Sequence, residues 1–522
     1  MTRSPDDHSV AQNNRLLYAA WFIIALGVLA RLITYARYRV LWLDESYTAT
    51  SILNHSFAGL FQPLDQFQIV PPFYLSLVKC CTLIFGEHEY ALRFPSLLAG
   101  CAFLILAYAL LRRISNPLET LLSITLLASA GMYLYYSAEC KPYMLDTLIF
   151  IGLILLALDY EQSPHPTLKQ SIAFACAGAI AVWTSFPSAF VLAGIGLVQG
   201  IHILATQNWK RIRSLILPYF IWAGAFIVLY IILIRPGLTA DTTHHGQDLN
   251  TVMKQSWKFG FLPFPPQSLG EVQLYKNQLL RIFYTPLGFR MNGLAIFVSL
   301  IGAWSLWTRN KIAFGLLTTP LLLTFAASLI KLYPFDGRMI LFLTPALYIF
   351  IGLGIAFLIQ NLRKGGWAVG AILILLLIAP PTARMAKKTV IAEPRQEIDL
   401  AFEYVHENWQ GGDLLYLTYY DSLVYRVAKY WYPMPNGATV IQEDVAWEYQ
   451  EAPKALEQNL RTIGPAYKRL WLPLGFHLDA NAFLAEIPQT FTQTQAGQWD
   501  GIHLYQYTMD RKTDSTTPPD AL

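Results

Sequence analysis

Apolar residues fill long stretches of the first 385 residues, and short polar turns separate most of these stretches. A helix that crosses a bilayer needs about 20 predominantly apolar residues. Stretches of about this length lie at residues 16–36, 91–111, 118–136, 142–159, 170–186, 188–206, 214–234, 291–307, 312–331, 338–360 and 366–383. The pattern predicts a polytopic α-helical membrane protein with about 11 transmembrane helices.

The polar loop that follows the first span contains two shorter apolar patterns. Residues 71–85 are apolar but too short to cross a bilayer, and they begin with two prolines. Residues 47–60 start with Tyr47 and place apolar side chains at helical spacing among polar ones. Both patterns predict interfacial helices in the first outer loop.

The pattern changes after residue 385. Short segments with helical or strand character follow one another at residues 395–409, 414–420, 421–431, 469–474 and 502–507. Such alternation is typical of a small α/β sheet domain. We therefore predict three parts, namely a transmembrane domain over 1–385, a soluble α/β domain over 386–510 and a disordered tail over 511–522.

Basic residues in the short loops predict the orientation of the helices, because cytoplasmic loops are enriched in lysine and arginine. If the spans alternate, one face receives Arg15, Arg112, Arg113, Lys210, Arg211, Arg213, Arg309, Lys311, Arg363 and Lys364. We therefore expect a multi-pass protein of the plasma (inner) membrane. Its N-terminus would be cytoplasmic, and its C-terminal domain periplasmic or extracellular.

Composition agrees with a membrane protein and excludes some functions. Charged residues make up 14% of the 522 residues and hydrophobic residues 54%, whereas soluble domains contain roughly 25% charged residues. The net charge of +4 is too small for the chain length to indicate nucleic-acid binding. No cysteine follows Cys176, so the C-terminal part has no disulfide framework.

Two adjacent carboxylates, Asp44 and Glu45, follow the first span by a few residues. They come just before the predicted interfacial helix and therefore lie near the outer membrane surface. The structural alternative is that Asp44 caps this helix and Glu45 favours its positive end.

Lys141 and Tyr143 lie in a short turn between two predicted spans on the same outer face. They could hold a phosphate near the bilayer surface. The alternative is an ordinary interfacial belt with a snorkelling lysine. Asp146 follows Tyr143 by three residues and would therefore face the same site.

Asp336 and Arg338 lie in another short outer loop, and Arg338 opens a long apolar helix. An arginine in this position suits an anionic headgroup. A local ion pair between Asp336 and Arg338 is the alternative. Carboxylates, a lysine and an arginine on one membrane face suit the transfer of a group from a lipid phosphate.

The central outer loop has a group of residues that could bind a metal, namely Asp241, His244, His245 and Asp248. Histidines in loops are usually solvated instead. We therefore predict no metal site and no certain cofactor, and leave a divalent cation open.

Several short motifs follow one another in a fixed order, namely Leu43-Asp44-Glu45, Pro71-Pro72-Phe73-Tyr74, Phe85-Gly86, Ala91-Leu92-Arg93-Phe94-Pro95-Ser96, Lys141-Pro142-Tyr143, Gly337-Arg338-Met339 and Leu343-Thr344-Pro345. With them, the chain resembles membrane glycosyltransferases of the GT-C fold. The type it most resembles is family 39/83, which includes protein mannosyltransferase-like and lipid A aminoarabinose transferase-like proteins. The resemblance covers about residues 15–385 and is most specific over 40–145.

The resemblance implies a reaction and a set of residue roles. Such enzymes move a monosaccharide from a polyprenyl-phosphate donor to an acceptor on the outer face, usually with inversion. Asp44 would be the catalytic base and Glu45 would support it. The donor phosphate would meet Lys141, Arg338 and Tyr143 as its charge develops. Further substrate contacts are expected from Tyr47, Pro72, Tyr74, Arg93 and Asp336.

The implied partners are the polyprenyl-phosphate sugar donor, a lipid, glycan or protein acceptor, and membrane lipids. Related enzymes often have a basic residue before the double proline, where this chain has Val70. Two other functions stay open. A transporter or flippase would need charges or broken helices near the middle of the bilayer, and a non-catalytic scaffold would not depend on Asp44. The middle of each predicted span is nearly free of charge, which favours an enzyme acting at the interface.

Overall fold

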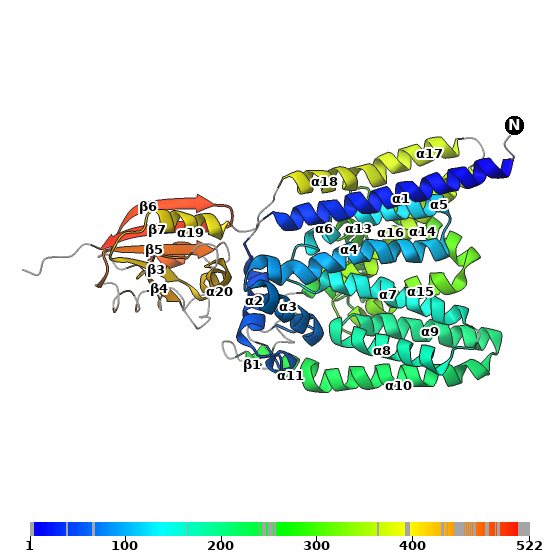
Figure 1. Cartoon of the computed structure of the whole chain (residues 1–522), viewed down its shortest axis with the longest axis horizontal. Helices are drawn as coiled ribbons and strands as arrows, with labels where there is room; N and C mark the ends of the chain where they lie inside the picture. Colours follow the sequence, from blue (N-terminus) through cyan, green and yellow to red (C-terminus); the bar gives the residue numbers. More distant parts are fainter. Residues whose placement is uncertain are drawn as a thin grey trace, which may run out of the picture.

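The chain forms a bundle of long helices with a small sheet-containing part at one end (Figure 1). The computed structural model describes residues 5–37, 40–64, 68–163, 165–239, 241–242, 247–248, 254, 257–362, 365–391, 397–429, 433–435, 437–442, 454, 456, 458, 460, 462, 466–475, 480–485, 487 and 491–509. His244, His245 and the predicted tail at 511–522 lie outside these described residues.

The helices of the bundle follow the apolar stretches of the sequence. They are α1 (Pro5–Ala36), α2 (Leu43–Asn54), η1 (Gly59–Phe61), α3 (Pro72–Phe85), α4 (Glu89–Ile114), α5 (Pro117–Ser129), α6 (Gly131–Tyr136), α7 (Tyr143–Gln162), α8 (Leu168–Thr184), α9 (Ser188–Thr206), η3 (Trp209–Arg211), α10 (Ile212–Leu229), η4 (Tyr230–Ile234), α11 (Arg235–Thr239), η5 (Lys258–Gly260), α13 (Leu269–Tyr284), α14 (Asn292–Arg309), α15 (Lys311–Leu329), η6 (Gly337–Leu343), α16 (Thr344–Asn361), α17 (Gly366–Leu373), η7 (Ile374–Ile378) and α18 (Ala379–Val390).

Eight helical segments of the described chain are long and apolar enough to cross a membrane. They confirm the predicted polytopic α-helical membrane protein, but they do not confirm a count of 11. The predicted spans at 118–136, 170–186 and 291–307 are helical without meeting the same criterion. The first of them is interrupted, because Ala130 has an extended backbone between α5 and α6.

Close backbone contacts hold the centre of the bundle together. A Cβ atom added at Gly302 of α14 would lie 1.8 Å from the carbonyl oxygen of Phe350 in α16. A Cβ atom at Gly354 would lie 2.1 Å from the carbonyl oxygen of Val298. Small residues at helix contacts allow this approach, which is a common way of packing helices in membranes.

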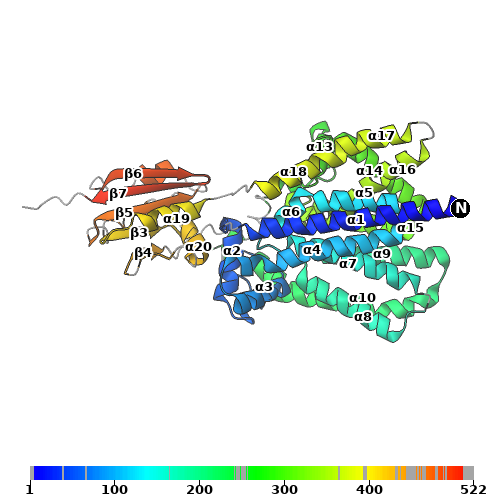
Figure 2. The same cartoon turned by 45° about the horizontal axis from the view of Figure 1, so that its top comes forward.

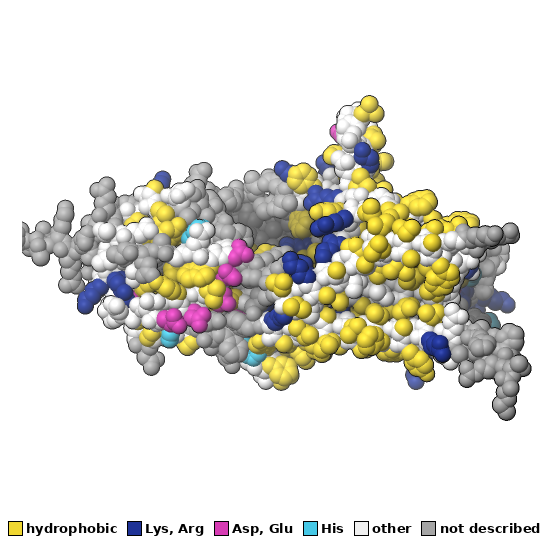
Figure 3. Space-filling model, turned by 90° about the horizontal axis from the view of Figure 1, so that it is seen from above, with side chains coloured by type: hydrophobic (Ala, Val, Ile, Leu, Met, Phe, Trp, Pro, Cys, Tyr) yellow, Lys and Arg dark blue, Asp and Glu magenta, His cyan; other side chains and the backbone are white. Residues whose placement is uncertain are grey.

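The outer surface of the bundle is largely apolar, as Figure 3 shows for one face. Large apolar side chains on the helices are exposed, among them Phe220, Ile216 and Leu375. A surface of this kind needs lipid to cover it. In the same view, lysine and arginine side chains gather at the end of the bundle that faces the sheet-containing part.

The C-terminal part contains a five-stranded sheet in the order β4-β3-β5-β7-β6. Its elements are α19 (Ile398–Glu407), β3 (Asp413–Leu417), α20 (Tyr419–Ala428), β4 (Thr439–Gln442), β5 (Arg469–Gly475), α22 (Ala480–Ala485), β6 (Phe491–Trp499) and β7 (Ile502–Met509). β3 runs parallel to β4 and β5, and β7 runs antiparallel to β5 and β6. This confirms the predicted small α/β fold, although two strands, β4 and β6, were not predicted.

The first outer loop forms the predicted helices α2 and α3, and they lie between the bundle and the C-terminal part (Figures 1 and 2). α2 contacts α3 on one side and α20 on another. The buried Val40 packs in the core beneath the sheet, whereas the next residue, Leu41, packs with α2 and α3. The short segment before α2 is therefore fixed between both parts of the chain. A separate short hairpin, β1 (Asp241–Thr242) with β2 (Gln247–Asp248), belongs to the central outer loop.

Candidate active site

The two carboxylates in the first turn of α2, Asp44 and Glu45, contact different partners. The N-cap of α2 is Trp42, which makes no side-chain cap, so the alternative that Asp44 caps this helix is wrong. Consecutive helical residues point about 100° apart. Asp44 therefore faces the ends of α7 and η6, whereas Glu45 faces α4.

Asp44 lies between two cations that come from distant parts of the sequence. Lys141 Nζ is 3.0 Å from Asp44 Oδ1, and Arg338 Nη1 is 2.6 Å from Asp44 Oδ2. The side chain of Asp44 is 16% exposed and that of Arg338 is 26% exposed, so the cluster is partly open. Lys141 is more enclosed, and it also donates to Thr48 Oγ1 at 2.8 Å and to Gln68 Oε1 at 3.1 Å.

The two cations set the charge state of Asp44. Burial alone would raise the pKa of its carboxyl, but Lys141 and Arg338 outweigh burial and hold the pKa below the ordinary value of 3.8. Asp44 is therefore ionised at neutral pH. Two positive charges against one negative charge leave this three-residue cluster with a net charge of about +1, which favours the binding of an anion.

Two aromatic rings hold the guanidinium of Arg338. Its Cζ atom lies 5.5 Å from the ring centroids of both Tyr143 and Trp257. Both distances are typical of cation–π contacts, which stabilise a cation while leaving its N–H groups available. Arg338 Nε is buried and has no hydrogen-bond partner within the described part of the chain.

Glu45 forms a separate, fully buried ion pair. Arg93 Nε donates to Glu45 Oε1 at 2.8 Å and Arg93 Nη2 donates to Glu45 Oε2 at 2.7 Å. The backbone N–H of Cys140 also donates to Glu45, at 2.7 Å. Since Cys140 precedes Lys141, this contact attaches the loop that carries the lysine to α2. Glu45 and Arg93 therefore position Lys141 against Asp44.

A second contact fixes the same loop. Trp42 Nε1 donates to Glu139 Oε2 at 2.8 Å, and Glu139 is fully buried. Ser96 Oγ of α4 donates to the carbonyl oxygen of Lys141 at 3.2 Å. The turn between α6 and α7 is thus tied to α2 and α4 before any substrate binds.

The other predicted contacts lie around this cluster. Asp336 accepts from Arg281, with 2.9 Å between Asp336 Oδ2 and Arg281 Nη2, so the alternative of a local pair with Arg338 is wrong. Tyr74 is fully buried in the core between α2 and α3, and Pro72 opens α3. Tyr47 is half-buried on α2. For these residues, contact with substrate stays a prediction.

Some residues near the site were found only in the structure. Trp257 lies in the central outer loop, and no local pattern there connects it with Arg338. Thr48 and Gln68 hold Lys141, and their polar side chains gave no specific signal.

Asp146, which the sequence placed on the face of Tyr143, is buried and its Oδ1 atom has no hydrogen-bond partner among the described residues.

No group of three or more metal-ligating side chains occurs among the residues that the structure describes. Asp241 and Asp248 are partners in the backbone register of the β1–β2 hairpin, but both histidines of the predicted group fall outside the described residues.

Comparison with known proteins places this geometry in a known fold. A family model described as dolichyl-phosphate-mannose-protein mannosyltransferase matches residues 70–234. The fold is similar to that of ArnT from Cupriavidus metallidurans bound to undecaprenyl phosphate, with a TM-score of 0.56 and 12% identity over 93% of this chain and 97% of that chain. ArnT in the apo state gives a TM-score of 0.57, with the same identity and coverage. No curated protein matches the sequence significantly.

These matches agree with the resemblance seen in the sequence. The match to ArnT covers both the helical bundle and the C-terminal part and confirms the predicted GT-C fold. The family match includes α3, α4, α7 and the loop with Lys141. Together they support a membrane glycosyltransferase of the GT-C fold.

Proposed function

We propose that this protein is a glycosyltransferase that moves a hexose or pentose from a polyprenyl-phosphate donor to an acceptor on the outer face of the membrane, with inversion at the anomeric carbon. The observation that carries the proposal is the partly exposed Asp44 carboxylate between Lys141 and Arg338. The family match and the fold shared with ArnT support the same class of reaction.

The two cations suit the donor's phosphate. A sugar linked through a phosphate diester to a polyprenol carries one negative charge, which balances the net charge of the Asp44 cluster. The side chain of Arg338 is 26% exposed, and guanidinium groups bind phosphate through several donors at once. Lys141 adds a compact charge on the opposite side of Asp44. ArnT binds undecaprenyl phosphate, and we assign a ligand of the same chemistry to this chain.

Donor binding would also activate the base. In the free protein both cations hold the pKa of Asp44 low, so its carboxylate is a weak proton acceptor. A phosphate that takes over the N–H groups of Lys141 and Arg338 weakens their hold on Asp44 and raises its pKa. The carboxylate then becomes a better base only when the donor is present.

The transfer step follows from these positions. Asp44 accepts the proton of an acceptor hydroxyl, and the acceptor oxygen forms a bond to the anomeric carbon. The bond between that carbon and the phosphate oxygen breaks, and polyprenyl phosphate leaves with an additional negative charge. Lys141 and Arg338 stabilise this developing charge. Such electrostatic stabilisation is usually the largest single contribution to catalysis. Attack from the face opposite the phosphate gives inversion.

The position of the cluster favours this function over transport. Asp44 follows the end of α1, Lys141 lies between α6 and α7, and Arg338 begins the helical segment that leads into α16. All three therefore lie at one end of the bundle. A transporter would need its polar site near the middle of the bilayer. We place the cluster and the C-terminal part on the periplasmic or extracellular side of the plasma (inner) membrane.

The proposal is tested by comparing wild type with Asp44→Asn in membranes supplied with labelled polyprenyl-phosphate sugars and extracted lipid, glycan and protein acceptors. Asp500→Asn makes the same chemical change at an exposed position and serves as the control. Wild type and Asp500→Asn should transfer label, and Asp44→Asn should lose at least 100-fold of the rate, on the order expected for loss of a general base. If all three proteins transferred label equally, the assignment of Asp44 as the base would be wrong. If none of them consumed any donor, the proposed reaction would be wrong.

A further inference from the structure

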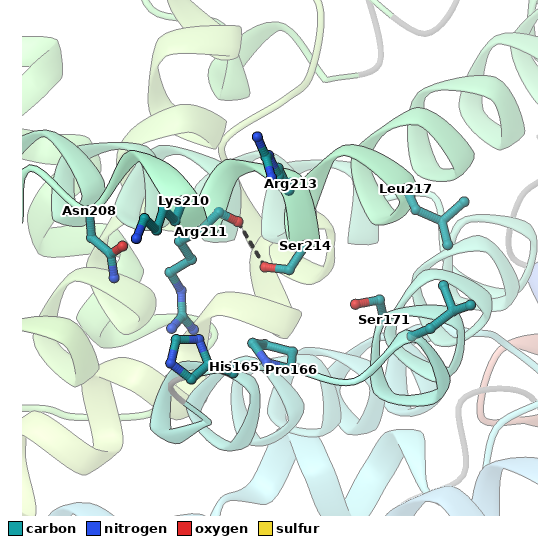
Figure 4. Close-up of a pocket in the computed structure, with 10 residues that line it drawn as sticks. His165, Pro166, Ser171, Asn208, Lys210, Arg211, Arg213, Ser214 and Leu217 are labelled. Carbon is teal, nitrogen blue, oxygen red and sulfur yellow. Dashed lines mark hydrogen bonds between the residues drawn. The ribbon is translucent and has the colours of Figure 1, made fainter.

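A polar cavity lies far from Asp44, at the other end of the bundle. It has a volume of about 340 Å³ and lies between the start of α8 and the start of α10. Its lining includes His165, Lys210, Arg211, Arg213 and Ser214 (Figure 4). Cavities of this size hold small ligands or the headgroups of larger ones.

The helix that carries the cavity shows how far it is from the candidate active site. A continuous helical path runs through α10, η4 and α11, from Ile212 to Thr239. Near its far end, Gly237 packs against Ile69, next to the Gln68 that holds Lys141. At a rise of 1.5 Å per residue, this path is about 40 Å long. The cavity therefore opens at the opposite membrane surface, where the basic loops predict the cytoplasm.

One of the basic residues of the cavity has a structural role. Arg211 is buried, and it donates to the carbonyl oxygens of Tyr160 at 2.8 Å and Ser163 at 3.2 Å. Its Nη2 atom lies 3.4 Å from Glu161 Oε2, so most of its charge is balanced inside the protein. Arg211 therefore shapes the wall of the cavity by joining the end of α7 to the start of α10.

Two other basic residues are not balanced in this way. Lys210 and Arg213 are exposed, and neither side chain forms a hydrogen bond or ion pair with any described residue. Ser171 adds a hydroxyl group to the lining from α8, and His165 adds an imidazole from the loop before it. The cavity thus offers two unpaired positive charges and several neutral polar groups to a ligand, which favours an anion.

An apolar surface continues from the cavity along the helices. Ile212, Ile216 and Phe220 follow one another at a spacing of four residues on α10, and they are 40%, 60% and 77% exposed. Leu168 and Ile172 form the corresponding exposed positions on α8. α8 and α10 pack closely, since Trp222 Nε1 donates to the carbonyl oxygen of Ala175 at 3.1 Å. The exposed side chains of both helices therefore form an apolar track next to the charged cavity.

We propose that this cavity binds the phosphate of an anionic membrane lipid, with Lys210 and Arg213 as its charge partners and the acyl chains along α8 and α10. An anionic phosphate group is the shared chemistry of a lipid headgroup and of a soluble phosphate. The apolar track favours the lipid, because a soluble phosphate would make no use of it. Basic pockets between transmembrane helices on the cytoplasmic side suit anionic headgroups for the same electrostatic reason. The proposal does not depend on the reaction at Asp44.

The test measures lipid binding to the full-length protein in detergent by native mass spectrometry. Wild type is titrated with phosphatidylglycerol and compared with the double variant Lys210→Gln/Arg213→Gln. The control, Arg112→Gln/Lys311→Gln, removes two exposed charges from other basic loops of the same predicted face. The Lys210→Gln/Arg213→Gln variant, here called the pocket variant, should bind phosphatidylglycerol about 30-fold more weakly than wild type. This corresponds to a factor of about five to six for each charge removed. The control should change affinity by less than about threefold.

Two further arms identify the source of the phosphate. Phosphatidylcholine, which has no net charge, should bind wild type and both variants with the same low affinity. Inorganic phosphate at millimolar concentration should not displace phosphatidylglycerol from wild type. If inorganic phosphate displaced phosphatidylglycerol from wild type but not from the Lys210→Gln/Arg213→Gln variant, the lipid assignment would be wrong. The cavity would then be a site for a soluble phosphate. Equal binding of phosphatidylglycerol by all three proteins would overturn the site itself.

Discussion

Removing Arg93 should destabilise the protein strongly, because it would leave a buried charge without its main partner. The side chain of Glu45 is fully buried, and Arg93 supplies two hydrogen bonds to it at 2.8 and 2.7 Å. Breaking a buried ion pair from one side typically costs about 3–5 kcal/mol. We expect Arg93→Met to lower the free energy of unfolding by about this amount.

A double-mutant cycle separates the charge effect from the loss of packing. Glu45→Gln in the Arg93→Met background removes the stranded negative charge, so the double variant should regain much of the lost stability. The measurement is unfolding in detergent, followed by tryptophan fluorescence for wild type, both single variants and the double variant. Arg93→Met should be less stable than the double variant.

An exposed ion pair provides the matched control. Arg113 pairs with Asp159 at the opposite end of the bundle, and these side chains are 36% and 45% exposed. Exposed pairs contribute about 0–1 kcal/mol, so Arg113→Met should change stability by no more than that. If Arg93→Met were as mild as Arg113→Met, the reasoning that Glu45 needs Arg93 as a buried partner would be wrong.

Other predictions concern the site and the C-terminal part. Trp257→Ala removes one ring from Arg338, and a cation–π contact of about 0.5–2 kcal/mol should appear as a 2- to 30-fold higher KM for the donor with a smaller change in kcat. The pKa of Asp44 lies below 3.8, so its carboxylate stays ionised until the pH falls through that lowered pKa. The rate constant kcat/KM should therefore fall only below about pH 4. Lys141→Gln removes one of the two cations that lower this pKa and should move the fall in kcat/KM to higher pH. Arg469→Met leaves the buried carboxylate of Asp413 in β3 without its cationic partner, which should cost roughly 3 kcal/mol of stability. The C-terminal part should then be cleaved about 100-fold faster in limited proteolysis.

Part of the candidate site could be predicted from the sequence. Asp44, Lys141 and Arg338 were noticed as charged residues at the ends of spans, and the resemblance to GT-C glycosyltransferases implied their roles. Their mutual contacts were not, since Asp44 and Arg338 are 294 residues apart and several helices must pack before they meet. Trp257 gave no signal, because an aromatic residue in an outer loop is common.

The differences in the fold have similar physical causes. The span predicted at 118–136 is apolar throughout, but hydropathy does not report the extended backbone at Ala130 that ends α5. The strand β6 was missed because its sequence, Phe491–Trp499, is mostly polar and lies at the edge of the sheet with a register shift. β4 is a four-residue strand at the other edge. Edge strands need no continuous apolar pattern, since one side of each faces solvent.

The segment before α2 has a consequence for how the protein is made. Val40 packs in the core beneath the C-terminal sheet, and its neighbour Leu41 packs in the core of α2 and α3. That sheet includes β7, which ends at Met509. During synthesis, Val40 emerges more than 350 residues before β3 and more than 450 residues before β7, and both strands contribute to the core around it. The segment that leads into α2 therefore reaches its final packing only after β7 has been synthesised, so a chain that is released before β7 would leave Val40 uncovered beside Asp44.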